Sequence, residues 1–406
     1  MSQQEGAAPP PTLILGLALG FLCVLGPLSI DLYLPAMTTM KAEFATSDGA
    51  VQRTLSVFFL ALACAQIPIG AFGDRFGRRL PLLVGLSVFI AASAGCAMAV
   101  SVDQLIVFRF LQGLGACAGT AVARAMIRDL RTGHEAAKLM AFSFLVIGIS
   151  PVAAPLLGNL ALGVMEWRGL FVMLAIAGVA ALAASAMLLP ESLPPEKRQS
   201  ARAPILAGFP ELLRSPGFQK WSIVAGLATT IPFAYVTAAP FVFSGVYGLP
   251  PANYTLLLAL NAGASILATQ FAPALMRRWG APVLIRRASM AAFVVSALVL
   301  CLAQFGQAPL VAFQLYSMAI FAVSGLMLTP AAITALDSAR ASAGAAAGLV
   351  GTCQLLITAL ASAVVSMFTA HSIVPLLSVL AAGLFVVAVL SSLTRAPLLA
   401  DAPKPG

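Results

Sequence analysis

The chain has 406 residues, of which 60% are hydrophobic and only 9% are charged, and its mean hydropathy is +0.98. A soluble globular domain carries about 25% charged residues, so this composition excludes a soluble enzyme, a disordered chain and a fibrous repeat. The net charge of +9 would suggest nucleic-acid binding in a soluble protein. In so apolar a chain, basic residues instead set orientation in a membrane, and we expect a bilayer partner and no nucleic acid.

The apolar stretches predict twelve membrane-spanning helices, since one span needs about 20 mostly apolar residues. The first six are expected at residues 12–37, 49–72, 79–100, 103–130, 136–163 and 167–189. The second six are expected at residues 218–246, 252–276, 281–304, 308–335, 342–370 and 373–394. Residues 190–217 between them are the most polar segment. The sequence thus predicts an all-α membrane protein with six-helix bundles at 1–189 and 218–406 and a cytoplasmic linker at 190–217.

The N-terminus and the cysteines carry little chemistry. Residues 1–11 contain a single charge, Glu5, and no basic run, so we expect the first apolar stretch to be retained and not cleaved as a signal peptide. The six cysteines all lie in apolar stretches without C-x-x-C spacing. This favours burial over disulfides or a metal site, and we expect no metal and no cofactor.

The basic residues are distributed unevenly between the predicted loops. With both termini cytoplasmic, 19 of the 23 lysines and arginines fall on the inner face and three on the outer face. This asymmetry predicts the orientation. The remaining basic residue, Arg109, falls inside a span.

The two halves resemble each other at their inner loops. The segment GAFGDRFGRRLPLL begins at Gly70, and PALMRRWGAPVLI begins at Pro273. Placing Gly77 on Gly280 aligns them with an offset of 203 residues, half the chain. Duplicated six-helix halves around a midplane site are typical of secondary transporters.

The first of these segments also has a distinctive G-x-x-x-D-R-x-G-R-R spacing. Its glycines permit tight turns and close helix approach, while its acidic and basic side chains lie together at a helix end. It resembles the inner-loop signature of the major facilitator superfamily. That resemblance implies a gate latch between helices two and eleven formed by Asp74, Arg75 and Arg79. The residues expected to act in gating are Gly70, Asp74, Arg75, Gly77, Arg78 and Arg79.

Two further segments resemble motifs of the same superfamily. RFLQGLGACAG, from Arg109, is similar to the fourth-helix signature, and SPVAAPLLGN, from Ser150, is similar to the fifth-helix motif of antiporters. The residues assigned to the antiporter motif are Pro151, Pro155 and Gly158. Ala154 and Asn159 stand where the family usually has glycine, and small residues at this spacing equally suit plain helix packing.

A narrower resemblance is to the Bcr/CflA group of multidrug efflux transporters. It rests on PLSIDLYLPAM from Pro27, MIRDL from Met126, AAPFVF from Ala238, LALN from Leu258 and PESLPPEKR from Pro190. The resemblance covers nearly the whole chain and implies a drug-like substrate and a proton-driven cycle.

Asp31 is the only carboxylate placed well inside a predicted span, and Arg109 is the only deeply placed base. Each lies six residues from the predicted outer end of its helix, or about 9 Å at 1.5 Å per residue. Charged groups inside a membrane are costly and usually functional. We therefore expect Asp31 and Arg109 to act as a pair in proton coupling. The alternatives are an interfacial carboxylate for Asp31 and a structural ion pair or carbonyl clamp for Arg109.

A site for varied lipophilic ligands is expected to present aromatic and methionine surface with few polar groups. The candidate substrate contacts are Tyr33, Met37, Phe58, Gln112, Met140, Tyr235, Phe241, Asn261 and Gln354. For any one of them, simple packing is the alternative.

Together these patterns predict a monomeric, multi-pass bacterial inner-membrane antiporter that exports small lipophilic drugs by alternating access, driven by the proton gradient. The rival hypothesis is a transporter of a native metabolite such as an amino acid or sugar. An enzyme is not expected, because no nucleophile–base pair or metal cluster lies within the spans. A channel or scaffold would not explain the latch-like loop.

Overall fold

The computed structural model describes residues 12–131, 133–198, 209–306, 308–339, 343–368 and 372–393. The described residues form helices and no strands, and by their contacts they group into two units. The first unit runs to the linker and also includes Gly248–Ala259; the second contains the other described residues from 209 onward. The predicted all-α fold class is confirmed.

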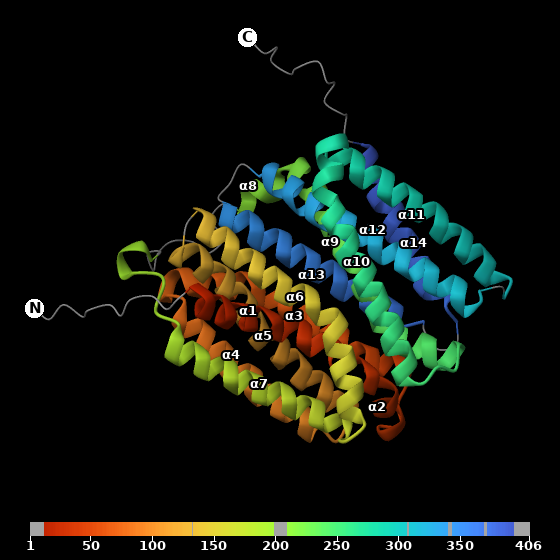
Figure 1. Cartoon of the computed structure of the whole chain (residues 1–406), viewed down its shortest axis with the longest axis horizontal. Helices are drawn as coiled ribbons and strands as arrows, with labels where there is room; N and C mark the ends of the chain where they lie inside the picture. Colours follow the sequence, from red (N-terminus) through yellow and green to blue (C-terminus); the bar gives the residue numbers. More distant parts are fainter. Residues whose placement is uncertain are drawn as a thin grey trace, which may run out of the picture. The chain divides into compact units, whose positions relative to one another are not determined.

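The first unit contains seven α-helices within its described residues (Figure 1). They are α1 (Thr12–Asp31), α2 (Met37–Glu43), α3 (Asp48–Phe76), α4 (Arg79–Met98), α5 (Val102–Leu130), α6 (Gly133–Leu162) and α7 (Trp167–Leu188). A 3-10 turn, Leu34–Ala36, joins α1 to α2, and another, Pro195–Lys197, lies in the linker.

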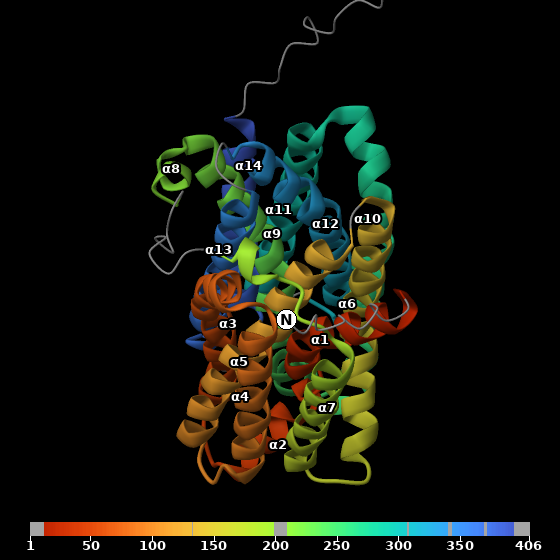
Figure 2. The same ribbon diagram turned by 90° about the vertical axis from the view of Figure 1, so that its left-hand side faces the viewer.

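The described part of the second unit also consists mainly of helices joined by short turns (Figure 2). Its helices are α8 (Phe209–Arg214), α9 (Pro216–Phe241), α10 (Pro251–Trp279), α11 (Ala281–Gln304), α12 (Leu310–Asp337), α13 (Ala343–Ser366) and α14 (Val374–Ser392). A π-helical turn, Val242–Val246, extends α9, and the first residues of α10 belong to the first unit.

Eleven of the described helical segments are long and apolar enough to cross a bilayer. The described part of α6 adds a shorter apolar stretch, Val146–Leu162. Twelve helices therefore lie where the sequence predicted spans, most of them within a few residues of the predicted ends.

The first predicted span is wrong at its C-terminal end. Residues 12–37 were expected to form one helix, but α1 stops at Asp31 and α2 begins at Met37. Pro35 explains the break, because in a continuous helix its ring would collide with the carbonyl of Asp31, four residues earlier. Asp31 thus occupies the end of a helix and not its interior.

The two halves pack by the same scheme, as the sequence repeat predicted. Helix α1 contacts α5, α6 and α7, and its counterpart α9 contacts α12, α13 and α14. Helix α4 likewise contacts α5 and α7, as α11 contacts α12 and α14. The aligned glycines Gly77 and Gly280 both have positive φ, 93° and 76°, just before α4 and α11. These are backbone angles that glycine adopts without strain.

Close helix contacts depend on glycines that face backbone carbonyls. A β-carbon at Gly119 would lie 2.8 Å from the Leu22 carbonyl oxygen, and one at Gly113 would lie 2.7 Å from the Phe58 carbonyl oxygen. At Gly158, in the predicted antiporter motif, a β-carbon would collide with the Leu32 carbonyl oxygen. Gly158 therefore lets α6 approach the break after α1.

Replacing Gly158 with alanine should destabilise the protein. We expect the Gly158→Ala variant to lose about 1–3 kcal/mol, because the new methyl group has no room against the Leu32 backbone. Gly148→Ala on the same helix is the matched control, since nothing lies within 4 Å of its β-carbon position. Thermal unfolding of the purified variants measures both. Equal melting temperatures would show that Gly158 is not a packing residue.

Candidate functional site

The side chain of Arg109 is fully buried inside the first unit. Its Nη1 donates to the carbonyl oxygen of Ser29 at 3.0 Å and to Oε1 of Gln112 at 2.6 Å. Gln112 in turn donates from Nε2 to Oγ of Ser93 at 2.8 Å. The chain of contacts fixes α5 against α1 and α4.

The Ser29 carbonyl is available because α1 ends two residues later. The last carbonyls of a helix lack intrahelical partners, and a cation there also interacts favourably with the helix dipole. Arg109 therefore forms the carbonyl clamp that the sequence analysis gave as one alternative for this residue.

Aromatic rings surround the rest of the guanidinium. Its Cζ lies 4.5 Å from the ring centroid of Tyr33 and 4.3 Å from that of Phe58, with Phe171 at 5.9 Å. These distances are those of cation–π contacts. Arg109, its polar partners Ser29, Gln112 and Ser93, and the rings of Tyr33 and Phe58 are called the Arg109 cluster below.

One edge of this guanidinium lacks hydrogen-bond partners among the described residues. Nε and Nη2 of Arg109 donate no hydrogen bond to any described residue. The nearby Tyr33 hydroxyl instead forms a hydrogen bond of 2.9 Å with Oγ1 of Thr54. A guanidinium edge of two N–H groups matches the two oxygens of a carboxylate. Nε and Nη2 of Arg109 thus keep the donor geometry that a carboxylate would match, while Nη1 holds the Ser29 carbonyl.

Asp31 is buried but is not paired with Arg109. Its closest described polar partner is Ser150 of α6, whose Oγ lies 3.5 Å from Oδ2. Among the described side chains, no lysine, arginine or histidine nitrogen lies within 4 Å of this carboxylate. Asp31 and Arg109 therefore form no direct ion pair in this arrangement, and their joint role in proton coupling stays a prediction. The equal depth predicted for the two side chains requires a first helix that ends at Met37, whereas α1 ends at Asp31 and Arg109 contacts the Ser29 carbonyl in its last turn.

At the other end of the first unit, Arg78 forms the centre of an ionic cluster. Its guanidinium contacts Oδ1 of Asp74 at 2.7 Å and Oδ2 of Asp129 at 2.8 Å. Ser192 donates to the same Asp129 oxygen at 3.1 Å. Burial lowers the pKa of Arg78, but the hydrogen bonds and charges of Asp129 and Asp74 outweigh it and leave that pKa above its ordinary value. Arg78 is therefore a permanent cation.

Glu191 joins the linker to the start of α4. Its carboxylate accepts hydrogen bonds from the backbone amides of Arg78 at 2.8 Å and Arg79 at 3.2 Å. These amides belong to the first turn, where a helix lacks internal acceptors and favours negative charge. The glycine at position 77 leaves space for this carboxylate, which a β-carbon would hit.

The structure corrects the predicted latch in two respects. Gly70 lies within α3, which continues to Phe76, and a β-carbon there would meet nothing within 4 Å, so Gly70 serves neither a turn nor a close contact. The central basic residue is Arg78 and not Arg75 or Arg79. Arg75 lies 5.5 Å from the Phe76 ring, and Arg79 donates to the Ala186 carbonyl at 2.5 Å. The gating role of the segment stays a prediction.

The second unit contains a neutral counterpart of the Arg109 cluster. Asn261 and Tyr235 are buried there, and Oδ1 of Asn261 accepts a hydrogen bond of 2.9 Å from Nε2 of Gln314. The ring of Tyr235 stacks on Phe313 with centroids 5.9 Å apart and meets Phe321 edge-on at 5.3 Å. These five residues, with Ser317 and Phe243, are called the Tyr235 cluster below.

The two clusters occupy repeated positions of the sequence. The equivalent pairs are Tyr33 and Tyr235, Phe58 and Asn261, Gln112 and Gln314, and Ser93 and Ser296, each 202 or 203 residues apart. At an offset of 202, as for Gln112 and Gln314, Arg109 corresponds to Val311, and at 203 to Ala312; neither residue is charged. Only the first cluster therefore carries a charge. The sequence analysis named most of these residues but did not recognise them as equivalent.

The other candidate substrate residues are less informative. Met37 is fully buried, Phe241 is 5% exposed, and Gln354 is half-buried. The side chain of Met140 lies outside the described part of the structure. In the predicted antiporter motif, Pro155 and Gly158 are buried and Pro151 is half-buried.

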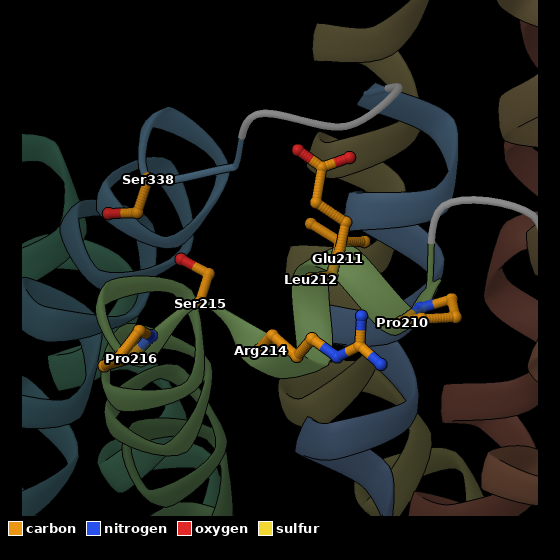
Figure 3. Close-up of a pocket in the computed structure, with 7 residues that line it drawn as sticks. All are labelled: Pro210, Glu211, Leu212, Arg214, Ser215, Pro216 and Ser338. Carbon is orange, nitrogen blue, oxygen red and sulfur yellow. The ribbon is translucent and has the colours of Figure 1, made fainter.

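A cavity of about 770 Å³ lies away from all of these residues, at the end of the linker (Figure 3). Its lining residues are Pro210, Glu211, Leu212, Arg214, Ser215, Pro216 and Ser338. It shares no residue with either cluster, and we assign it no part in substrate binding.

Comparison with known proteins places the chain among transporters. A family model described as Major Facilitator Superfamily matches residues 17–362. An uncharacterised transporter of this superfamily from Bacillus subtilis, YdgK, is 31% identical over 388 residues, covering 94% of each chain. A bicyclomycin resistance protein homolog from Haemophilus influenzae is 27% identical, covering 93% of this chain and 94% of its own.

A solved structure shares the fold. A bacterial homolog of the human lysosomal transporter Spinster superimposes with a TM-score of 0.70 and 17% identity. The match covers 95% of this chain and 96% of that one.

Removing the charge of Glu191 should destabilise the start of α4. We expect Glu191→Gln to lower the stability by about 1–2 kcal/mol, because charge-assisted hydrogen bonds to helix amides are stronger than neutral ones. Glu196→Gln is the matched control, since that residue is exposed in the same linker. Differential scanning fluorimetry should show a drop of a few degrees for the first variant only. A drop of equal size in both would refute the capping role.

Proposed function

Because this chain belongs to the major facilitator superfamily, we propose that it is a proton-coupled antiporter that exports small lipophilic drugs across the bacterial inner membrane. The family establishes a membrane transporter of small molecules and not an enzyme. The resemblance to the drug-resistance group is also confirmed by the comparisons. In the proposed cycle the protein alternates between states open to either side, with both termini in the cytoplasm.

Two observations support a drug as the substrate. The Haemophilus relative carries the name of bicyclomycin resistance. The candidate substrate residues also include several buried aromatic side chains, among them Phe58, Tyr235 and Phe241. Apolar surface with a few fixed polar groups suits ligands of varied shape.

The observation that carries proton coupling is the buried carboxylate of Asp31. It lies at the break in the first span with the Ser150 hydroxyl at 3.5 Å as its described polar partner. An intramembrane carboxylate of this kind is a group that can bind a proton on one side and release it on the other. Because α1 ends at Asp31, its neighbourhood can change when the helices on either side of the break move.

Arg109 supplies a second position for this carboxylate. Its Nε and Nη2, which have no described hydrogen-bond partner, can donate to the two oxygens of a carboxylate, while Nη1 stays on Ser29. In the proposed cycle, deprotonated Asp31 moves to these two nitrogens, and protonated Asp31 returns to Ser150. The arrangement described here has Asp31 beside Ser150, the position proposed for the protonated carboxyl.

The transport test uses a host that lacks its own drug exporters. Expression of the chain should raise resistance to some members of an antibiotic panel that includes bicyclomycin. Inverted membrane vesicles should then take up the same drugs only while a proton gradient is maintained. Uptake that persists after the gradient collapses would contradict antiport. Uptake of sugars or amino acids in place of drugs would favour a metabolite transporter.

Asp31→Asn should abolish proton-coupled export, because asparagine cannot bind and release a proton. We expect drug uptake driven by an imposed pH gradient to fall to the level of vesicles without the protein. Equilibrium drug binding should be retained within a few-fold. Asp103→Asn, an exposed carboxylate in the first turn of α5, is the control and should transport normally. If Asp31→Asn still concentrates the drug, the proton carrier lies elsewhere.

Asp74→Asn should slow transport without weakening drug binding. Asp74 contacts Arg78 at a helix end and none of the candidate substrate residues, so its loss should alter the rate of interconversion and not the affinity. Initial uptake rates and equilibrium binding of the same drug separate the two effects. A large loss of affinity would instead place Asp74 at the substrate.

A further inference from the structure

The Tyr235 cluster holds two buried hydrogen-bond donors that lack partners. Tyr235 is 1% exposed and Asn261 is fully buried, yet neither the Tyr235 hydroxyl nor Nδ2 of Asn261 forms a hydrogen bond with any described residue. A buried polar group without a partner usually costs about 1–3 kcal/mol, so such groups are rare unless they have a function.

The two donors lie next to each other. The Tyr235 hydroxyl interacts with the side chains of Asn261 and Ser317, although neither contact has the geometry of a hydrogen bond. Ser317 donates its own proton to the Phe313 carbonyl at 2.7 Å. Oδ1 of Asn261 accepts a hydrogen bond from Gln314, so Nδ2 of Asn261 points away from the Gln314 Nε2. A single acceptor atom could therefore bind both free donors.

Three phenylalanine rings pack against the ring of Tyr235. The Tyr235 ring contacts Phe313, Phe321 and Phe243 with centroid separations of 5.9, 5.3 and 6.4 Å. Phe243 and Phe313 also meet edge-on at 5.8 Å. Aromatic pairs at these distances contribute favourably beyond the area they bury. A ligand ring that displaced Phe321 from Tyr235 would restore the same kind of contact.

We propose that the Tyr235 cluster recognises the carbonyl oxygen of an uncharged ligand that carries an aromatic ring. The hydroxyl of Tyr235 and Nδ2 of Asn261 donate to the carbonyl oxygen, and the ring packs against Tyr235 and Phe313. This inference deepens the proposed function, on which it rests, by naming a chemical class of substrate.

Charge excludes the closest alternative, an anionic ligand. None of the residues that form the Tyr235 cluster is basic, and the positions equivalent to Arg109 at offsets of 202 and 203, Val311 and Ala312, are uncharged. A carboxylate placed here would be buried without a counter-charge, which costs far more than two hydrogen bonds return. A neutral amide or ketone oxygen avoids this cost.

The test compares two probes that differ in the carbonyl. Acetanilide has a benzene ring and an amide oxygen, whereas N-ethylaniline keeps the ring and the chain but lacks that oxygen. Binding of each to the full-length protein in lipid nanodiscs is measured by ligand-observed NMR, with empty nanodiscs to subtract partition into lipid. The wild type should bind acetanilide more tightly than N-ethylaniline.

Tyr235→Phe should then lower the acetanilide affinity about five- to tenfold and leave that of N-ethylaniline unchanged, because it removes one donor and keeps the ring. Tyr316→Phe is the matched control. It removes a buried hydroxyl that already bonds Ser296 at 3.0 Å, so the preference for acetanilide should persist.

Three results would overturn the proposal. One is a wild type that binds neither probe above empty nanodiscs, and another is an equal loss for both probes in Tyr235→Phe. The third is a Tyr235→Phe variant whose acetanilide preference is unchanged, which would mean that the Tyr235 hydroxyl does not bind the ligand. Binding is measured without a gradient, so these outcomes are independent of whether Asp31 drives export.

Discussion

The buried guanidinium of Arg109 is the interaction on which the first unit depends. Pro35 ends α1 at Asp31, the break frees the Ser29 carbonyl, and Arg109 takes that carbonyl at 3.0 Å. The rings of Tyr33 and Phe58 then replace part of the solvation that the cation loses on burial. The charge is held by the Ser29 carbonyl, the Gln112 amide and two rings, and not by a carboxylate, so Nε and Nη2 have no described hydrogen-bond partner. The end of α1 before Pro35 therefore accounts for the Arg109–Ser29 contact and for the absence of an Asp31–Arg109 pair.

Duplication of the fold gives two related clusters with different chemistry. Tyr33 and Tyr235 occupy the same place in their repeats, as do Gln112 and Gln314, but the base of the first half has no equivalent in the second. Under the proposed function, the charged cluster serves proton coupling and the neutral one serves ligand recognition. With the two tasks separated, an uncharged ligand does not have to replace the polar contacts of a buried charged side chain, which would cost free energy. Both clusters still share one packing scheme.

The sequence predicts the spans well because each depends on a local run of apolar residues. It also identifies Asp31 and Arg109, since ions are scarce in such runs. The sequence analysis is wrong for features that depend on a single proline or on residues far apart in the chain. The break at Pro35 was overlooked in an otherwise apolar stretch, and the contacts of Arg78 come from residues 51 and 113 positions away, Asp129 and Glu191. No periodicity connects those positions, so only the packed helices reveal them.

The central claim is that Asp31 carries the proton that exchanges for drug. The most direct measurement is the number of protons released when a transported drug is added to the purified protein in weakly buffered detergent solution, followed with a pH indicator. The wild type should release protons on binding, and Asp31→Asn should release none while binding the same drug. Equal proton release from the two proteins would contradict the account.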